Sequence, residues 1–273
     1  MGQKIAMRIN EPIDRLANWS YHNYPFGNTP RGNIEYYKNT WLEAMQKKYA
    51  VVDQYTKKTG YEIDLTWFHE LALHTQVVKK RSEICYQHGR LLYATLSAYM
   101  AENSHHNINI LETGTARGFS SLCMARALQD AGRAGKIFTF DVLPHETKMY
   151  WNCIDDEMGP QTRKQLINKY ESLIDNYIIF IQGDSKIQLK KIDISRIHFA
   201  FLDGAHTYEH VMSEFNFLRS KQLQKDVIFF DDYTPDNFPG VVKAVDKLCF
   251  ENNYTKEVIT LNKNRGYVIA RKK

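Results

Sequence analysis

The feature that most constrains the fold is an alternation of short apolar runs with amphipathic segments, which begins after Asn103. Seven runs have the length and composition of β-strands, and they cover residues 108–112, 136–141, 177–182, 197–203, 227–231, 255–261 and 266–271. Helices are expected to begin between them, near Gly118, Gly159, His206 and Asn237. Strands that alternate with helices form βαβ units, so we predict an α/β fold built on a parallel sheet.

The end of the chain departs from this alternation. The last two runs are joined by Asn262-Lys263-Asn264-Arg265, a loop short enough for a β-hairpin. Hairpin strands are antiparallel, so the sheet is expected to end antiparallel. The two helices before this hairpin each carry an apolar face that can cover the sheet. These faces consist of Val211, Phe215 and Leu218 and of Val241, Val245 and Leu248.

Residues 1–103 show a different pattern. Up to about residue 60 the chain is rich in aromatic and turn-forming residues with little periodicity, which favours an irregular arm. From Asp64 to Tyr99 apolar residues recur mostly at three- and four-residue steps, which predicts helix, and Gly89 could divide this helix in two. We therefore predict a helical N-terminal arm and cap over residues 1–103 and an α/β domain over residues 104–273.

Composition argues against several classes of protein. At 273 residues, with 43% hydrophobic and 25% charged residues, the chain can bury a sizeable core. No run approaches the roughly 20 apolar residues of a membrane span. The net charge of +5 is spread over short clusters, so we expect neither a nucleic-acid nor a membrane partner. Four scattered cysteines and no signal-like apolar run near Met1 favour a cytoplasmic protein with reduced thiols. These features are compatible with a homo-oligomer.

The strongest local signal is the turn after the first predicted strand, in the segment ILETGTARGFSS. Gly114 and Gly118 can let the backbone approach a ligand closely. A dinucleotide-binding turn has the spacing G-x-G-x-x-G, whereas these glycines are four residues apart, so pyrophosphate binding is poorly supported. The pattern E-x-G-x-x-x-G, which starts at Glu112, instead suits a ligand without phosphates. The alternative is a strand-to-helix turn that binds nothing.

Two further strand ends add polar side chains at the same edge of the sheet. Asp141 ends the second predicted strand, 29 residues after Glu112 (141 − 112). A carboxylate there can accept hydrogen bonds from both ribose hydroxyls of a nucleoside, although it could equally cap a helix. The third strand ends in IQGDS, which places Asp184 and Ser185 where they could contact an adenine.

Three aspartates follow the fourth and fifth predicted strands, in the segments FLDGAH and FFDDY. Asp203 and Asp231 would end neighbouring strands about 5 Å apart, at the edge where open α/β sheets bind ligands. Unpaired carboxylates there would repel one another, and a hard cation such as Mg²⁺ would resolve this. Adjacent strand residues point to opposite faces, so Asp231 and Asp232 can both be ligands only if the strand ends between them. Alternatively, one of them caps the next segment and His206 opens a helix.

These segments carry a resemblance to a known family. AFLDGAHTYEHVMSEF, VIFFDDYTP and a following helix with Gly240, Val241 and Ala244 resemble the metal-dependent sugar O-methyltransferases of the macrocin O-methyltransferase type. These are class I methyltransferases, which use S-adenosylmethionine (SAM), and the resemblance covers roughly residues 105–271. It implies a Rossmann-like seven-stranded sheet, mostly parallel with the last strand antiparallel, with helices on both faces. It also implies SAM as methyl donor and a divalent cation beside the acceptor hydroxyl.

The resemblance implies roles for individual residues. Asp203, Asp231 and Asp232 would be metal ligands, and His206 would be the general base beside Asp203 in the catalytic site. The expected cofactor-binding residues are Glu112, Gly114, Thr115, Gly118, Ser120, Asp141, Asp184, Ser185 and Asp203. Acidic and backbone groups of the first turn could bind the ammonium, carboxylate and sulfonium groups of SAM separately.

Two alanines depart from the family pattern: Ala116 stands where many relatives have glycine, and Ala205 where some have an acidic base. The second departure leaves His206 as the favoured base. We predict a SAM-dependent O-methyltransferase that acts on a hydroxyl of a small molecule or sugar, with Mg²⁺ or another divalent cation. In this prediction residues 104–273 bind SAM and residues 1–103 cover the acceptor. Two alternatives stay open: an oxidoreductase that binds NAD or a nucleotide sugar on a similar sheet, and a SAM-binding protein without activity.

Two other clusters are interpreted as structural. His69 and His74 lie five residues apart, whereas a zinc-binding helix needs four, so their rings would point to different faces. Asp155, Asp156 and Glu157 fall in a long loop over residues 144–158. They are expected to form a mobile rim rather than a second ligand site, although this rim could act as a lid over SAM.

Overall fold

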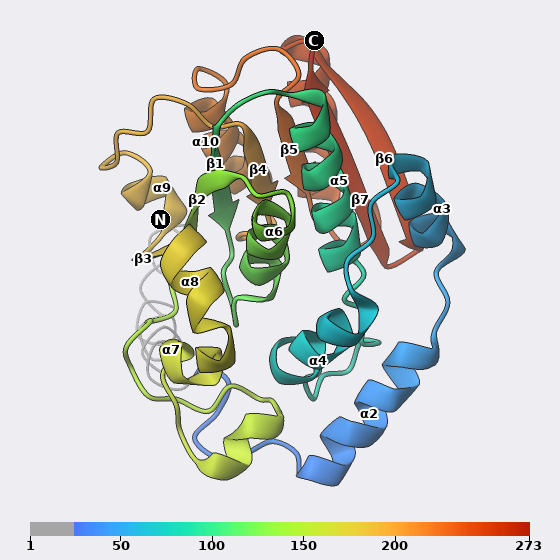
Figure 1. The fold of residues 1–273 in the computed structure, drawn as a ribbon, viewed down its shortest axis with the longest axis vertical. Coiled ribbons are helices and arrows are strands. Elements are labelled where there is room, and N and C mark those ends of the chain that lie inside the picture. Colours follow the sequence, from blue (N-terminus) through green and yellow to red (C-terminus); the bar gives the residue numbers. More distant parts are fainter. Residues whose placement is uncertain (1–24) are drawn as a thin grey trace, which may run out of the picture.

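The computed structural model describes residues 25–273, and Figure 1 labels its helices from α2 onward. Seven strands form one sheet in the order β3-β2-β1-β4-β5-β7-β6. They are β1 (Asn107–Thr113), β2 (Ala134–Asp141), β3 (Ile178–Gln182), β4 (Phe199–Leu202), β5 (Val227–Phe230), β6 (Tyr254–Asn262) and β7 (Arg265–Lys272). Each predicted strand overlaps one of these, so the predicted α/β class is confirmed.

The strand directions also agree with the prediction. Strands β1 to β5 pair with parallel neighbours, and β7 is antiparallel to both β5 and β6. The last strand therefore runs against the rest of the sheet. The cause is local, because β6 and β7 are joined by a turn at residues 263–264, and a turn this short can only connect antiparallel neighbours.

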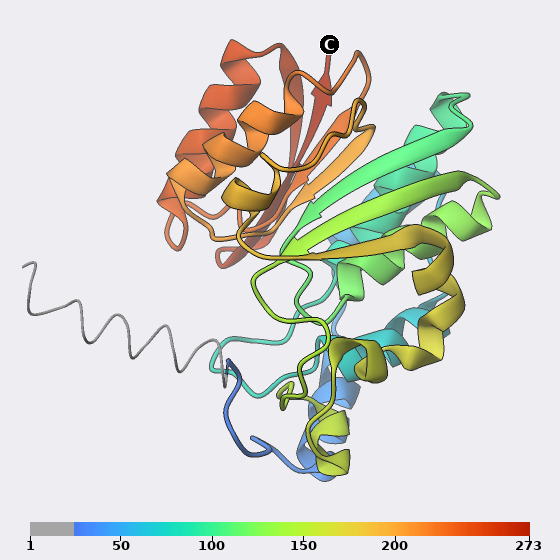
Figure 2. The same cartoon turned by 90° about the vertical axis from the view of Figure 1, so that its left-hand side faces the viewer.

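Helices lie on both faces of the sheet. They are α2 (Ile34–Gln46), α3 (Ala50–Thr59), α4 (Leu65–Thr75), α5 (His88–Glu102), α6 (Phe119–Asp130), α7 (Arg163–Leu166), α8 (Glu171–Tyr177), α9 (Ser185–Gln188), α10 (Tyr208–Leu218) and α11 (Pro239–Glu251), with short 3₁₀ turns η1 (Ile154–Met158) and η2 (Asn168–Tyr170). In Figure 2 the sheet lies between α10 and α11, coloured orange to red, and the green α6. The helices predicted near Gly118, His206 and Asn237 begin within two residues of those positions, and the one predicted near Gly159 begins at Arg163.

The N-terminal segment is more regular than predicted. Helices α2 and α3 occupy most of residues 34–59, so the predicted irregular arm is wrong there. Asn33 starts α2 by accepting a hydrogen bond from the Tyr36 N–H, a capping signal that the aromatic composition obscured. The earlier part of the predicted arm, residues 1–24, lies outside the described residues.

The predicted division of the following helix is confirmed, but it does not occur at Gly89. Helices α4 and α5 are separated by residues 76–87, and Gly89 lies in the first turn of α5. A Cβ at Gly89 would lie 2.7 Å from the side chain of Phe119 and 2.8 Å from that of Cys123. This glycine therefore sets how closely α5 approaches α6, rather than where a helix ends.

Two hydrophobic cores form, one on each face of the sheet. Phe201 and Phe229 belong to the core that contains α5 and α6, whereas Leu202 and Phe230 belong to the core that contains α10 and α11. This division follows from the two-residue period of a strand. Because every residue of β4 and β5 is buried, these strands are continuous apolar runs in the sequence.

Helix α5 links the N-terminal segment to the sheet. Its residues from His88 to Met100 are buried, and it packs against α6 in the first of the two cores. The carboxyl ends of the parallel strands face the layer that contains α2 and α4 (Figure 2). No helix within residues 25–273 has both the length and the apolar character to cross a membrane.

Candidate active site

The glycine turn between β1 and α6 brings two strand ends into contact. Gly114 has φ +90°, in the left-handed region that favours glycine. A Cβ at this position would lie 2.0 Å from the backbone oxygen of Asp203, at the end of β4. Ala116 also has a positive φ, of +45°, so a glycine found there in relatives would relieve strain. The turn therefore needs Gly114 for both conformation and space.

Glu112 supports this turn from the core side. It is fully buried, and the hydroxyls of Ser120 and Ser121 donate hydrogen bonds to its two carboxylate oxygens. Burial raises the pKa of Glu112, while these hydroxyl donors oppose the rise. The carboxylate ties the end of β1 to the first turn of α6. The predicted cofactor residues Glu112 and Ser120 therefore contact each other.

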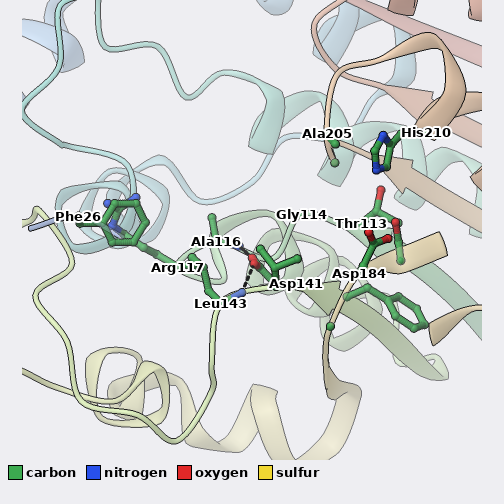
Figure 3. A pocket seen from close by; sticks show the side chains of 15 residues that line it. Phe26, Thr113, Gly114, Ala116, Arg117, Asp141, Leu143, Asp184, Ala205 and His210 are labelled. Atoms are coloured by element: carbon green, nitrogen blue, oxygen red, sulfur yellow. Dashed lines mark hydrogen bonds between the residues drawn. The ribbon is translucent and has the colours of Figure 1, made fainter. Parts of the chain in front are cut away.

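Asp141 holds the same turn from the end of β2. Its carboxylate accepts hydrogen bonds from the Ala116 N–H at 2.5 Å and the Leu143 N–H at 2.8 Å, both drawn in Figure 3. The Arg163 guanidinium lies 3.5 Å away. Burial raises the pKa of Asp141, and the charge of Arg163 and the two backbone donors lower it. A carboxylate with two such donors still has lone pairs for further partners.

A cavity of about 460 Å³ opens at the carboxyl ends of β1 to β4. Four predicted cofactor residues line it, namely Gly114, Asp141, Asp184 and Ser185, and Figure 3 shows Asp141 and Asp184 on opposite sides of the Gly114 turn. The sheet order reverses here, from β3-β2-β1 to β4-β5, which is where open α/β sheets bind ligands. Three more of the predicted residues, Thr115, Gly118 and Ser120, lie behind the turn rather than in the cavity wall.

Phe26 and Arg117 are among the residues of the cavity wall that the sequence analysis missed. Phe26 precedes α2, and its ring lies 4.4 Å from the guanidinium carbon of the buried Arg117. That guanidinium also donates a hydrogen bond to the backbone oxygen of Trp151. Both Phe26 and Arg117 line the cavity, so a segment far away in the sequence closes one side of it (Figure 3). In the sequence, the aromatic run around Phe26 was the feature that could have indicated a contribution of this segment to the cavity wall.

An acidic cluster lies next to this cavity. Asp203, His206 and Asp232 each offer one atom that could bind a metal, and these atoms all lie within 4.8 Å of one another. His206 Nδ1 is 3.2 Å from Asp232 Oδ2, and His206 Nε2 is 3.9 Å from Asp203 Oδ1. Burial lowers the pKa of His206, with the nearby Asp232 raising it and Arg265 lowering it further.

Asp231 lies directly after β5, beside this group of three. Strand β5 ends at Phe230, and the Asp231 carboxylate accepts a hydrogen bond of 2.6 Å from the Asp232 N–H. Asp232 has φ +55°, which turns the chain sharply after Asp231. Burial and the charge of Asp232 raise the pKa of Asp231 to about 7. The structure thus brings His206 into the group of three, and Asp231 lies outside it.

Arg265 supplies a positive charge that the sequence analysis did not assign. Its Nη1 lies 3.3 Å from Asp232 Oδ1 and 3.9 Å from Asp231 Oδ1. In the sequence it falls in the hairpin loop, and only the antiparallel pairing of β7 with β5 carries it to the strand ends. The guanidinium offsets part of the repulsion between the carboxylates, which the sequence analysis had left entirely to a metal ion.

Two clusters were interpreted as structural from the sequence, and side chains of both make contacts within the protein. His69 Nδ1 lies 2.9 Å from the Tyr86 hydroxyl and His74 Nδ1 lies 2.8 Å from Asp155, so the two rings have different partners. Asp156, expected in a mobile rim, is instead buried and accepts a 2.7 Å hydrogen bond from the backbone N–H of Trp151. Asp155 and Asp156 therefore anchor this loop.

The fold and the site together define the class of the protein. A sheet with only its last strand reversed, a glycine turn after β1 and a carboxylate at the end of β2 are the features of a class I methyltransferase. Residues 111–233, from β1 to just beyond β5, match a family model described as a methyltransferase domain. Residues 111–233 therefore form a methyltransferase domain on a sheet of the kind that SAM-dependent enzymes use.

Solved structures share this fold. The O-methyltransferase NovP is 18% identical, with a TM-score of 0.53 over 71% of this chain and 83% of its own. The O-methyltransferase TomG from Streptomyces achromogenes, involved in tomaymycin synthesis and solved with SAM, is 16% identical, with a TM-score of 0.50 over 77% and 91%. Cofactor-bound Rv0187 from MTB is 16% identical, with a TM-score of 0.51 over 76% and 86%. Identities this low show the fold alone. No curated protein matches the chain significantly.

Proposed function

We propose that the protein transfers the methyl group of SAM to a hydroxyl group of a small molecule or sugar. The observation that carries the proposal is that one loop contributes residues to both the cavity and the acidic cluster. Gly204 and Ala205 line the cavity, and the residues on either side of them, Asp203 and His206, belong to the cluster. A methyl group presented from the cavity would therefore meet an acceptor held beside a carboxylate and an imidazole.

The cavity suits SAM in its size and polarity. Asp141 would accept hydrogen bonds from the ribose hydroxyls, and Asp184 and Ser185 would contact the adenine. The backbone around Gly114 would receive the methionine part. Glu112 would act indirectly, through the position of the turn. NovP and TomG, whose fold this chain shares, are O-methyltransferases, which supports an oxygen acceptor.

The acidic cluster fits a small divalent cation, because the carboxylates of Asp203 and Asp232 converge there and hard cations prefer oxygen ligands. Asp203 and Asp232 would hold the cation, and Asp231 would act through its hydrogen bond to the Asp232 backbone. A bound Mg²⁺ would lower the pKa of an acceptor hydroxyl. The helices of residues 34–102 and the segment around Phe26 would cover the acceptor.

His206 is the proposed general base. Burial lowers its pKa, so the ring is neutral near pH 7 and can take a proton. Asp232 lies beside Nδ1 and would orient the ring, which leaves Nε2 for the acceptor proton. As the acceptor oxygen bonds to the methyl carbon, the carbon–sulfur bond breaks and its electron pair stays on sulfur. The acceptor proton passes to Nε2, and S-adenosylhomocysteine (SAH) is released.

The test combines binding with methyl transfer from radiolabelled SAM to a panel of hydroxylated small molecules and sugars, with Mg²⁺ or with EDTA. We expect SAM, but not NAD, to raise the melting temperature. Transfer should require Mg²⁺, whereas SAM binding should not. His206→Ala should lower the rate by about 10²- to 10⁴-fold with SAM affinity unchanged. The exposed His106→Ala is the control.

Three results would contradict parts of this proposal. Stabilisation by NAD and none by SAM would reject the cofactor. Full turnover in EDTA would show that the reaction needs no divalent cation. His206 would then be the one remaining catalytic candidate at the site. SAM binding without transfer to any hydroxyl, on the whole panel, would favour a SAM-binding protein without O-methyltransferase activity.

A further inference from the structure

Glu214 is a buried acidic residue beside the cavity that the proposed reaction does not use. It lies on α10 with 1% of its surface exposed. The hydroxyl of Ser185, which lines the cavity, donates a hydrogen bond of 2.7 Å to Glu214 Oε1. A Cβ at Gly204, another cavity residue, would lie 3.0 Å from the same oxygen. The carboxyl group therefore lies directly behind the cavity wall.

The protonation state of Glu214 decides what Ser185 can offer to a ligand. Burial raises the pKa of Glu214 to about 7, and the hydrogen bond from the Ser185 hydroxyl opposes the rise. An ionised carboxylate can only accept hydrogen bonds. The Ser185 hydroxyl must then donate its one proton to Glu214. Its oxygen can therefore only accept hydrogen bonds from a ligand in the cavity.

The neighbouring Asp184 also presents hydrogen-bond acceptors to the cavity. Asp184 Oδ1 already accepts a hydrogen bond of 2.8 Å from the Lys186 N–H, where it starts α9. Its carboxylate, like the Ser185 oxygen, can offer a ligand only acceptors when ionised. The end of β3 therefore offers acceptors for a ligand that brings donors.

We propose that Glu214 is a positioning residue that fixes the Ser185 hydroxyl as an acceptor, so that the cavity selects a 6-aminopurine over a 6-oxopurine. The inference rests on the proposed function, since it assumes that the adenine of SAM lies at the end of β3. The 6-amino group of adenine donates hydrogen bonds, whereas the 6-oxo group of hypoxanthine accepts them. An oxo group facing the Ser185 oxygen would bring two acceptors together and leave both without a partner.

The test compares SAH with its 6-oxo analogue, S-inosylhomocysteine, by titration calorimetry at pH 8. Wild-type protein should bind SAH about 10- to 100-fold more tightly, the usual effect of one unpaired buried polar group. In Glu214→Gln the amide N–H can donate to Ser185, which frees the serine proton to point into the cavity. The ratio of the two affinities should then fall towards one or reverse.

Two controls separate this effect from a loss of structure. Glu209→Gln makes the same change at an exposed position of the same helix and should keep the wild-type ratio. Ser185→Ala removes the hydroxyl while the Glu214 carboxyl group stays in the protein, and it should also reduce the ratio, which gives a reading even if Glu214→Gln does not fold. A wild-type ratio that falls between pH 8 and pH 6 would further support the proposal, because a protonated Glu214 can donate to Ser185.

The outcomes distinguish this inference from the proposed function. If wild-type protein binds SAH and either Glu214→Gln or Ser185→Ala retains the full preference for it, the inference is wrong and the cofactor assignment stands. If wild-type protein binds SAH and the oxo analogue equally, the inference is also wrong. If it binds neither, the cofactor assignment fails and the inference fails with it.

Discussion

Gly114 is the residue on which the geometry of the turn between β1 and α6 depends most directly. Its φ of +90° and the 2.0 Å between a Cβ built there and the Asp203 oxygen exclude any side chain without movement of β1 away from β4. Such a movement would displace the cavity and Asp203 together. We expect Gly114→Ala to weaken SAH binding at least about 100-fold, from strain and the clash combined.

Gly132→Ala is the matched control for this substitution. Gly132 has a positive φ of +59°, but a Cβ there would meet nothing within 4 Å. The control variant should therefore lose some stability through backbone strain and keep its affinity for SAH. Calorimetric titration of both variants checks the prediction, and equal affinities would show that the Gly114 turn does not form the cofactor site.

Arg265 competes with a cation for the same carboxylates. Its guanidinium lies 3.3 Å from Asp232 and 3.9 Å from Asp231. Removing the positive charge beside the carboxylates that would hold a divalent ion should favour binding of that ion by at least about 1.4 kcal/mol, which corresponds to about 10-fold. We therefore expect Arg265→Gln to bind Mn²⁺ at least about 10-fold more tightly than wild-type protein.

The control for Arg265→Gln lies on the same hairpin. Lys263→Gln removes the same charge from an exposed position in the turn and should change Mn²⁺ affinity little, since exposed charges are screened. Calorimetry or the electron paramagnetic resonance signal of free Mn²⁺ measures both variants. If the two variants bind Mn²⁺ alike, Arg265 does not regulate access to the acidic cluster.

At the scale of elements, the cavity proposed to bind SAM is built by strand ends together with a segment that precedes α2. Phe26 reaches the wall of the cavity by packing on Arg117 and by approaching Trp151, with ring centroids 5.9 Å apart. Truncation of this ring would open one side of the cavity to water. We expect Phe26→Ala to weaken SAH binding about 10-fold, in line with the loss of one partly buried aromatic side chain.

Phe250→Ala serves as the comparison, because Phe250 is 90% exposed near the end of α11 and lies outside the cavity lining. It should leave SAH affinity unchanged. A Phe26 variant with wild-type affinity would mean that the segment before α2 does not contribute to cofactor binding. The proposed role of the N-terminal segment would then be limited to the acceptor.

At the scale of the whole molecule, the sheet is held between two hydrophobic cores, and acidic groups buried beside it make stability depend on pH. Burial raises the pKa of Glu214 from 4.5 to about 7. A carboxyl group with a folded-state pKa above its unfolded value favours folding below the unfolded pKa. This contribution is lost as the pH rises through the window from about 4.5 to about 7.

Glu214→Gln should remove this dependence. Relative to wild-type protein, the free energy of unfolding of the variant should increase by about 3 kcal/mol between pH 4 and pH 8, since each unit of pKa shift corresponds to about 1.4 kcal/mol. Urea unfolding at several pH values measures the difference. A difference that stays constant across this range would show that Glu214 titrates as it does in the unfolded chain.

Much of the fold was determined by local sequence pattern. Strands β4 and β5 were predicted because burial on both faces makes them continuous apolar runs, and the reversed last strand followed from a two-residue turn. The glycine turn was recognised because Gly114 and Gly118 serve a conformation that few other residues adopt. Helix α2 was missed because its cap at Asn33 is a single contact within an aromatic-rich segment.

The positions of charged side chains at the site were decided only by the tertiary structure. The sequence by itself placed Asp203, Asp231 and Asp232 at neighbouring strand ends, but the end of β5 at Phe230 and the positive φ of Asp232 determine which of them meet. Arg265 reaches the site from a hairpin and Glu214 from α10, and the sequence assigned no role to either residue. Such contacts depend on backbone direction at single residues and on strand pairing across the sheet, and neither leaves a periodic pattern in the sequence.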